Sequence, residues 1–257
     1  MARRVKLEFN KRRLNGFSGN QLKLIACFLM LCDDIGFMLI ENGMLYGQNP
    51  DYWTLAVQSP QGEKLYLLAR ILRVIGRMAF PLFAYLLVEG FLHTKNRKQY
   101  GQRLLLLALI SEVPFDLACR HVLWEPAYQN VCFTLFLGVC ALTLIGRMKR
   151  LRLVPSLLIM ALFAGVSWLL RADYGAVGVV LIVLLYLLRK DHTIQLWAGA
   201  ILSAAESFHM YCVSALAFVL IRFYNGKRGT APLKYFFYIF YPLHLLLFWL
   251  LVYLGNQ

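Results

Sequence analysis

The feature that most constrains this chain is a series of apolar stretches, each long enough to cross a bilayer, separated by short polar turns. Hydrophobic residues make up 60% of the 257 positions, and every connecting turn is too short to hold a soluble domain. A helix needs ~20 apolar residues to cross the hydrocarbon core, and within that core its backbone polar groups are satisfied inside the helix itself. The sequence therefore predicts one all-α domain over residues 1–257, a polytopic transmembrane helical bundle.

The net charge of +14 lies mainly in the turns between the apolar stretches. Basic turns of this kind mark the cytoplasmic side of a membrane protein, so the charge indicates topology and no nucleic-acid partner is expected. The N-terminal tail, residues 1–19, is basic at Arg3, Arg4, Lys6, Lys11, Arg12 and Arg13. The apolar stretch behind it has no small-residue cleavage site and carries Asp33 and Asp34, so we interpret it as a retained helix and not as a signal peptide.

About nine spans fit this pattern, with the N-terminus in the cytoplasm, the C-terminus outside and membrane lipid as a partner. They are expected near 20–40, 65–93, 104–118, 130–146, 153–170, 174–188, 193–224 (two short spans) and 235–254. The segment 41–63, which holds Glu41 and no Lys or Arg, is expected as an outer loop, and Pro81 is expected to kink the second span. The two short spans would turn near Glu206–His209. A single broken helix there is the alternative, and it would place the C-terminus in the cytoplasm.

Ionisable side chains inside the second and third spans point to a buried polar site. Arg70, Arg73 and Arg77 are spaced three and four apart and therefore share one helical face. Glu112 and Asp116, four apart on the next span, are the expected counter-ions. An ionised group at the helix centre costs about 2.5–3.5 kcal/mol on insertion scales, so such residues need partners or a water-filled site. Two interpretations stay open: a structural ion-pair network, or a reaction or ligand site.

The six cysteines lie mostly within or beside apolar spans and form no C-x-x-C pair, which favours buried thiols over disulfides or metal ligands. No set of His, Cys and carboxylate residues has a metal-ligand spacing, so no metal is expected. Neither a Gly-rich phosphate loop after a strand nor a G-x-S-x-G elbow is present.

Several blocks of sequence carry a resemblance to a known family. They are GRMAFPLFAYLLVEGFLHT (76–94), RL…ISEVPFDLA (103–118), QNVCFTL (129–135), ADYGAVG (172–178) and YPLHLL (241–246). Together they resemble the TraX family of the bacterial cell membrane, whose named member acetylates the N-terminus of F-type pilin. The resemblance runs from about Leu22 to the last span. TraX proteins are in turn similar to integral-membrane acyltransferases that O-acetylate cell-surface glycans with cytoplasmic acetyl-CoA.

The resemblance implies transfer of an acyl group, acetyl in the family, from acyl-CoA to an acceptor at the membrane. The acceptor stays open among a peptide amine, a glycan hydroxyl, a lipid and a small amine. One position departs from the family. The first span of the family reads Asp-His-Ile-Gly, and in the related glycan acetylases a basic residue precedes a first-span His by eleven positions. Here Lys23 stands eleven positions before Asp34, so an Asp occupies the place of the expected catalytic His.

Three explanations of Asp34 remain open: a natural carboxylate base, an inactivating substitution, or a family member without transferase activity. A neutral His is a better base near neutral pH than an ordinary carboxylate. The change Asp34→His is therefore expected to raise turnover, unless Asp34 is itself the working base. Asp33, on the same turn, could orient an imidazole at 34. With Asp at 34, the two adjacent carboxyls are expected to share a poorly solvated region in which one stays protonated.

The candidate site residues fall into three groups. The catalytic candidates are Asp33, Asp34, Arg77, Glu112 and His244. The residues expected to bind the acyl-CoA co-substrate are basic and are Lys23, Arg73, His93, Arg97 and Arg103. The substrate candidates are Asp116, Asn130, Glu206, His209 and Tyr241. Six of these candidates have a plainer alternative: His244 as a hydrogen-bonded structural residue, His93 as a helix cap, Asn130 and Tyr241 as packing residues, and Glu206 with His209 as a solvated pair.

Arg77 is expected to polarise the thioester oxygen and to share one polar site with Glu112. A small transporter or a non-catalytic membrane scaffold is the competing function, because buried charge pairs also suit proton-coupled transport. Against transport, the two halves of the chain contain no matching pair of interrupted helices.

Overall fold

The computed structural model describes residues 16–148, 152–230 and 234–255. Within these ranges the chain is helical and has no strand, only isolated bridges at Phe17–Tyr224 and Gln129–Ala172. The expectation of an all-α fold is confirmed for this part of the chain. The basic N-terminal residues up to Arg13, together with Lys149 and Arg150, lie outside the described residues.

The first rod of the bundle combines α2 (Gly19–Asp34) with a π-helix, η1 (Ile35–Met44). Ser18 begins it with a capping box, in which its hydroxyl accepts from the backbone N–H of Gln21. The expected outer loop at 41–63 is wrong in detail. Helix continues to Met44, α3 spans Pro50–Gln58, and α4 begins at Pro60, because Asn49 and Ser59 each cap a helix that has Pro at its start.

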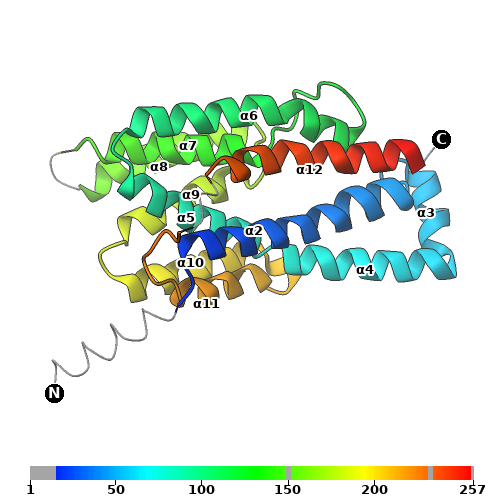
Figure 1. Ribbon diagram of the computed structural model, residues 1–257, viewed down its shortest axis with the longest axis horizontal. Coiled ribbons are helices and arrows are strands. Elements are labelled where there is room, and N and C mark those ends of the chain that lie inside the picture. The colour runs from blue at the N-terminus through cyan, green and yellow to red at the C-terminus, as the bar shows by residue number, and fades with distance from the viewer. Residues whose placement is uncertain (1–15, 149–151, 231–233, 256–257) are drawn as a thin grey trace, which may run out of the picture.

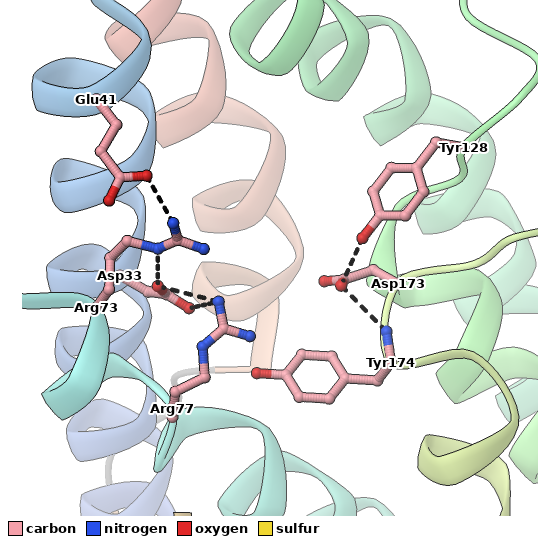
Figure 2. Close-up of polar contacts among 7 residues, drawn as sticks. All are labelled: Asp33, Glu41, Arg73, Arg77, Tyr128, Asp173 and Tyr174. Carbon is pink, nitrogen blue, oxygen red and sulfur yellow. Dashed lines mark hydrogen bonds and ion pairs between the residues drawn. The ribbon is translucent and has the colours of Figure 1, made fainter. Parts of the chain in front are cut away.

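The second rod consists of α4 and α5, and it is interrupted just before Pro81, where the sequence predicts a kink. Helix α4 (Pro60–Gly76) ends before Arg77 and Met78, and α5 (Ala79–His93) follows. Proline has no N–H and its ring crowds the carbonyl four residues earlier, here that of Arg77. The break leaves the Arg77 side chain at the junction of the two helices, where it faces α2 (Figure 2).

The middle of the chain forms α6 (Arg97–Arg120), α7 (Val131–Ile145), α8 (Leu153–Leu169) and α9 (Gly175–Leu187). The turn expected at 94–103 is shorter than that, because α6 begins at Arg97. Helices α7 and α9 approach closely through glycine: a Cβ built on Gly138 would lie 2.6 Å from the Ile182 side chain. Small residues of this kind allow helices in membranes to pack closely.

The segment 193–224 is a helical hairpin and not one broken helix. Helix α10 (His192–Glu206) is followed by two 3-10 turns, η2 (Phe208–Met210) and η3 (Val213–Leu216), and by α11 (Ala217–Arg222). The η3 turn and α11 pack back against α10. The last helix, α12 (Lys234–Gly255), packs against α6 and η1.

The helices therefore follow the segments expected from the sequence, and they run back and forth along the long axis (Figure 1). Among the described residues, two helices are long and apolar enough to cross a membrane: α4 with α5, 34 residues, and Phe236–Gly255 in α12, 20 residues. The nine-span topology and its orientation stay predictions.

Basic segments from distant parts of the chain meet at one end of the bundle. The backbone N–H of Gly19 donates to the Lys227 carbonyl at 2.8 Å, which ties the start of α2 to the segment after α11. The Arg97 guanidinium lies 2.9 Å from the place of a Cβ on Gly146, so the start of α6 meets the end of α7. Helices α3 and the end of α12 lie at the opposite end (Figure 1).

Candidate functional site

A chain of ion pairs joins the first two rods. The Arg77 Nη2 atom lies 3.3 Å from Asp33 Oδ2, and Arg73 Nε lies 3.6 Å from Asp33 Oδ1. Arg73 also donates from Nη1 to Glu41 Oε2 at 2.6 Å (Figure 2). Gly76 allows this approach, because a Cβ at that position would collide with the Asp33 Cβ. Two positive and two negative groups thus compensate one another where isolated charges would be costly.

The expected counter-ions of these arginines are wrong. The structure pairs Arg73 and Arg77 with carboxylates of the first rod, not with Glu112 or Asp116 on α6. The expectation that Arg77 and Glu112 pair or share one polar site is also wrong, because Arg77 pairs with Asp33 whereas Glu112 accepts from Asn130. The spacing of the arginines identified their common face correctly, but it could not identify the helix that lies opposite that face.

Glu112 and Asp116 stabilise the polar connection between α6 and α7. The Asn130 side chain donates from Nδ2 to Glu112 and, at 2.9 Å, to the Ala108 carbonyl, while its Oδ1 caps α7 by accepting from Cys132 N–H at 3.0 Å. Asp116 accepts from the backbone N–H of Glu125 at 2.8 Å. These contacts give Glu112 and Asp116 a structural role as hydrogen-bond acceptors. They also favour the packing interpretation of Asn130.

Asp34 meets a histidine from the other end of the chain. The His244 Nε2 atom lies 2.8 Å from Asp34 Oδ2, and its Nδ1 lies 2.8 Å from the Phe240 carbonyl oxygen. A carbonyl oxygen can only accept, so Nδ1 carries a hydrogen. One further proton therefore lies between Nε2 and the Asp34 carboxylate. The ring is held in place by Phe240, stacked at 5.0 Å between centroids, and Phe248, edge-on at 5.7 Å.

The two adjacent carboxylates interact electrostatically, as expected, but they face different partners. Consecutive residues of a helix point about 100° apart. Asp33 therefore faces α4 and the arginines, whereas Asp34 faces α12 and His244. Tyr241, also a candidate, is buried with its ring centroid 5.6 Å from that of His244.

A fourth carboxylate, Asp173, approaches from the loop between α8 and α9. Asp173 Oδ1 accepts from the Tyr128 hydroxyl at 2.8 Å and from the Tyr174 N–H at 3.0 Å (Figure 2). The Arg77 guanidinium lies 5.9 Å from the Tyr174 ring centroid and interacts electrostatically with Asp173. Burial raises the pKa of Tyr128, and the neighbouring Asp173 raises it further, so the hydroxyl stays protonated and donates. Burial also raises the pKa of Asp173, against the Tyr128 hydrogen bond and Arg77.

We refer to these side chains together as the polar centre. Its members are Asp33, Asp34, Glu41, Arg73, Arg77, Tyr128, Asp173, Tyr174 and His244. Sequence reasoning missed Glu41, Tyr128, Asp173 and Tyr174. The ADYGAVG block that carries part of the family resemblance was a signal for Asp173 and Tyr174, but a turn between two apolar spans does not by itself indicate that its side chains face the bundle.

The basic candidates for acyl-CoA binding, Arg73 excepted, lie at the helix ends. Lys23 is half-buried in the first turns of α2, 5.3 Å from the Phe237 ring centroid, and Arg97 at the start of α6 lies 4.8 Å from that of Phe91. His93, the last residue of α5, has its Nδ1 2.8 Å from the Glu89 carbonyl oxygen. Arg103 is half-buried, in the second turn of α6. Arg73 lies in the polar centre instead, so the structure does not bring the five together.

The remaining candidates lie at the end of α10. Glu206 is its last residue and is half-buried, and His209 is exposed in the η2 turn. Glu206 interacts electrostatically with both Arg77 and His209. All six cysteines are free thiols, and among the described residues no group of three or more His, Cys, Asp or Glu side chains could hold a metal ion.

Comparison with known proteins gives two matches. The family model described as "TraX protein" matches residues 18–252. The chain is also similar to the "Probable fimbrial assembly protein FimC, serogroup H1" of Dichelobacter nodosus, with 29% identity over 255 residues that cover 90% of this chain and 94% of the relative. No solved structure matches.

Proposed function

Because this chain belongs to the TraX family, we propose that it is a membrane-embedded acyltransferase that moves an acyl group, acetyl in the first instance, from acyl-CoA to an amine or hydroxyl. The observation that carries the proposal is the contact between Asp34 and His244 at 2.8 Å. The family pattern places an imidazole at position 34 on the first span. Here His244 presents an imidazole to that position from α12, and Asp34 is the carboxylate that holds it.

The pair suits proton transfer during acyl exchange. In the overall reaction the acceptor X–H attacks the thioester carbon, the C–S bond breaks, and the acceptor proton ends on the CoA thiolate. Asp34 engages His244 through Oδ2, and its Oδ1 makes no hydrogen bond with any residue that the structure describes, so Oδ1 can receive the proton of the attacking group. The shared proton between Asp34 and His244 then supplies the leaving sulfur, and the pair returns to its starting state. A correctly placed acid–base group of this kind contributes about 10²–10⁴ in rate.

Arg77 is placed to stabilise the negative charge that develops on the thioester oxygen. It pairs with Asp33 through Nη2, while its buried Nε–H has no hydrogen-bond partner among the described residues. The Nε–H of Arg73 also makes no hydrogen bond in the described part of the chain, but it is turned toward Asp33 Oδ1 at 3.6 Å, so Arg77 is the better placed donor. Fixed donors in a site shielded from water are worth more than donors in solution, and one such donor typically contributes about 10²–10³ in rate.

The donor would enter from the basic end of the bundle. There Lys23, His93, Arg97 and Arg103 can receive the phosphates of CoA. From Lys23 to Asp34 the chain advances eleven residues along one helix, a rise of about 16 Å. The pantetheine arm of CoA can extend over such a length. The phosphates would then stay near the cytoplasmic surface while the thioester reaches Arg77 and Asp34.

This arrangement favours the natural-base explanation of Asp34. An inactivating change would be expected to leave His244 without a matched partner, whereas here both ring nitrogens are engaged. For the acceptor, the name of the Dichelobacter nodosus relative makes a fimbrial subunit the first choice to try. Glycan hydroxyls, lipids and small amines are the others.

The experiment is a thermal-shift measurement on purified protein in detergent, followed by an assay of thiol release. Acetyl-CoA is expected to raise the melting temperature, whereas inorganic phosphate at equal concentration leaves it unchanged. Membranes supplied with fimbrial subunit or a mixed acceptor extract should then release free CoA. If saturating acetyl-CoA gives neither a shift nor thiol release, the transferase proposal fails and a transporter or scaffold becomes the better assignment.

A further inference from the structure

The loop between α8 and α9 is strained on both sides of Asp173. Arg171 and Tyr174 adopt left-handed backbone conformations, with φ of 51° and 59°. Neither residue is a glycine, so its side chain crowds the backbone in this region. Strain of this kind persists only where the surrounding structure fixes it, and it is concentrated at functional sites. The strain therefore points to a role for the side chain that this loop carries.

Hydrogen bonds to the start of α7 hold the loop in place. The Gln129 N–H donates to the Arg171 carbonyl at 3.3 Å, and the Asp173 N–H donates to the Gln129 carbonyl at 2.9 Å. The Thr134 hydroxyl donates to the Asp173 carbonyl. Because the backbone of Asp173 is bonded through both its N–H and its carbonyl, its side chain has a defined direction.

The Asp173 side chain points toward the arginines of the polar centre. Its Oδ1 is already engaged, because it accepts from both the Tyr128 hydroxyl and the Tyr174 N–H. Figure 2 shows the other carboxylate oxygen turned toward Arg73 and Arg77. Among the described residues, that oxygen makes no hydrogen bond, and no ion pair joins it to either arginine. Oδ2 can therefore accept from a ligand that donates.

The space between Asp173 and the arginines is accessible. The side chains of Asp33, Arg73 and Arg77 are 17–19% exposed, and Tyr128, on the opposite side of the space, is 37% exposed (Figure 2). Charged groups are costly against lipid tails, so a space that they line inside a bundle suits water or a polar ligand.

Asp34, the proposed proton acceptor, borders the same space. Asp173 interacts electrostatically with both Asp34 and Arg77. Tyr241 on α12 interacts with both carboxylates, and its ring centroid lies 5.6 Å from that of His244, the partner of Asp34. A head group between Asp34 and Asp173 would therefore lie near Arg77 as well, which is proposed to hold the thioester oxygen.

We propose that Asp173 selects the acceptor: its Oδ2 accepts one hydrogen bond from the acceptor head group, while Asp34 accepts another and takes the transferred proton. This assignment rests on the proposed acyl transfer. A neutral primary amine supplies both donors from one nitrogen. Its lone pair attacks the thioester carbon, one N–H proton passes to Asp34, and the other stays on the new amide nitrogen, bonded to Asp173. The C–S bond breaks, and the CoA thiolate takes its proton from the Asp34–His244 pair.

A secondary amine has a single N–H and cannot satisfy both carboxylates, so the test compares benzylamine with N-methylbenzylamine. The full-length protein in detergent is supplied with acetyl-CoA and one of the two amines, and the acetylated product is measured by mass spectrometry. We expect kcat/KM for benzylamine to be at least about tenfold higher, because a site built to bond an N–H group rejects an analogue that lacks it.

The N-methyl group also adds bulk, so the decisive variant is Asp173→Asn. The Tyr174 N–H can only donate, so it keeps the amide oxygen at the place of Oδ1 and turns the amide NH2 toward the acceptor. The loop therefore keeps its anchors, while a donor replaces Oδ2. We expect kcat/KM for benzylamine to fall at least about tenfold and the preference over N-methylbenzylamine to fall below about threefold, with the thermal shift by acetyl-CoA retained.

Asp191→Asn is the matched control. Asp191 also accepts from backbone N–H groups, but it does so at the start of α10, far along the chain from the polar centre. This variant should keep the preference of the unmodified protein. The inference is wrong if Asp173→Asn leaves the preference unchanged, or if Asp191→Asn lowers it equally.

The unmodified protein separates this inference from the proposed function. If it releases thiol with fimbrial subunit or acceptor extract but acetylates neither amine, or both equally well, the assignment of Asp173 is wrong while the transferase proposal stands. If it neither binds acetyl-CoA nor releases thiol with any acceptor, the proposed function fails, and the assignment of Asp173 fails with it.

Discussion

Removing one partner of the Asp33–Arg77 ion pair should cost much more stability than removing both. The pair is shielded, with each side chain 17% exposed, and the two groups lie 3.3 Å apart. Breaking a buried pair by deleting one member costs about 3–5 kcal/mol, because the other charge is left uncompensated. In Arg77→Met, Asp33 keeps Arg73 at 3.6 Å. We therefore expect the lower end of that range, about 3 kcal/mol.

The double variant Asp33→Asn with Arg77→Met removes both charges and leaves Arg73 paired with Glu41. Replacing a whole buried pair by groups of similar volume is often nearly neutral, so we expect a cost of at most about 1 kcal/mol. Equilibrium unfolding in mixed detergent micelles would give the values for the two single variants and the double variant. The reasoning is refuted if the cost of the double variant equals the sum of the two single costs, with a coupling energy between Asp33 and Arg77 below about 0.5 kcal/mol.

Three further predictions concern stability. Gly76→Ala should cost about 1–3 kcal/mol in the same unfolding assay, because its Cβ would meet Asp33. Gly165→Ala on α8, with nothing within 4 Å of the new Cβ, should be neutral or stabilising; equal effects would contradict this. Asn130→Ala should cost about 2–3 kcal/mol through loss of the α7 cap and of the Glu112 donor, and Asn130→Asp should not restore the loss, since it sets a second carboxylate against Glu112. Tyr128→Phe should cost about 1 kcal/mol by removing a hydrogen bond to half-buried Asp173, whereas Tyr211→Phe, at a residue 79% exposed, should change little.

The helical segments could be predicted from the sequence because apolar length and basic turns are local properties. The hairpin at 193–224 and the break before Pro81 both follow from such signals. Helix ends were less predictable. The apolar stretch begins near residue 104, but α6 begins at Arg97, since a helix can extend beyond its apolar part with a cap such as Asn96.

The polar centre could be predicted only in part. The spacing of Arg73 and Arg77 indicates one face, and the family pattern pointed to Asp34 and His244, which the structure brings together. The partners of the arginines, Asp33 and Glu41, depend on which helices are neighbours, and that information is not in the spacing along one helix. Asp173 is near the centre because the α8–α9 loop folds inward, which a charge in a turn does not reveal.

Within the polar centre, the Asp34–His244 pair is directly connected to the ion pairs of Asp33 with the two arginines. Asp33 and Asp34 are consecutive, so the ion-pair chain to Arg77 and the hydrogen bond to His244 begin on the same turn of α2. A change that shifts Asp33 should therefore alter the position of Asp34. This coupling predicts that Gly76→Ala lowers turnover as well as stability.

The measurement that tests the central claim most directly is the steady-state rate of acetyl-CoA thiol release by His244→Gln. We expect kcat to fall by about 10²–10⁴, with the KM for acetyl-CoA changed by less than about threefold, because the pair moves a proton and does not bind the donor. The kcat of Asp34→Asn should fall by a similar factor. The double variant Asp34→Asn with His244→Gln should have a kcat no lower than that of either single variant. His192→Gln, at a half-buried histidine near the basic end, should keep full turnover. A His244→Gln protein that folds normally and retains more than about a third of the original kcat would contradict the account.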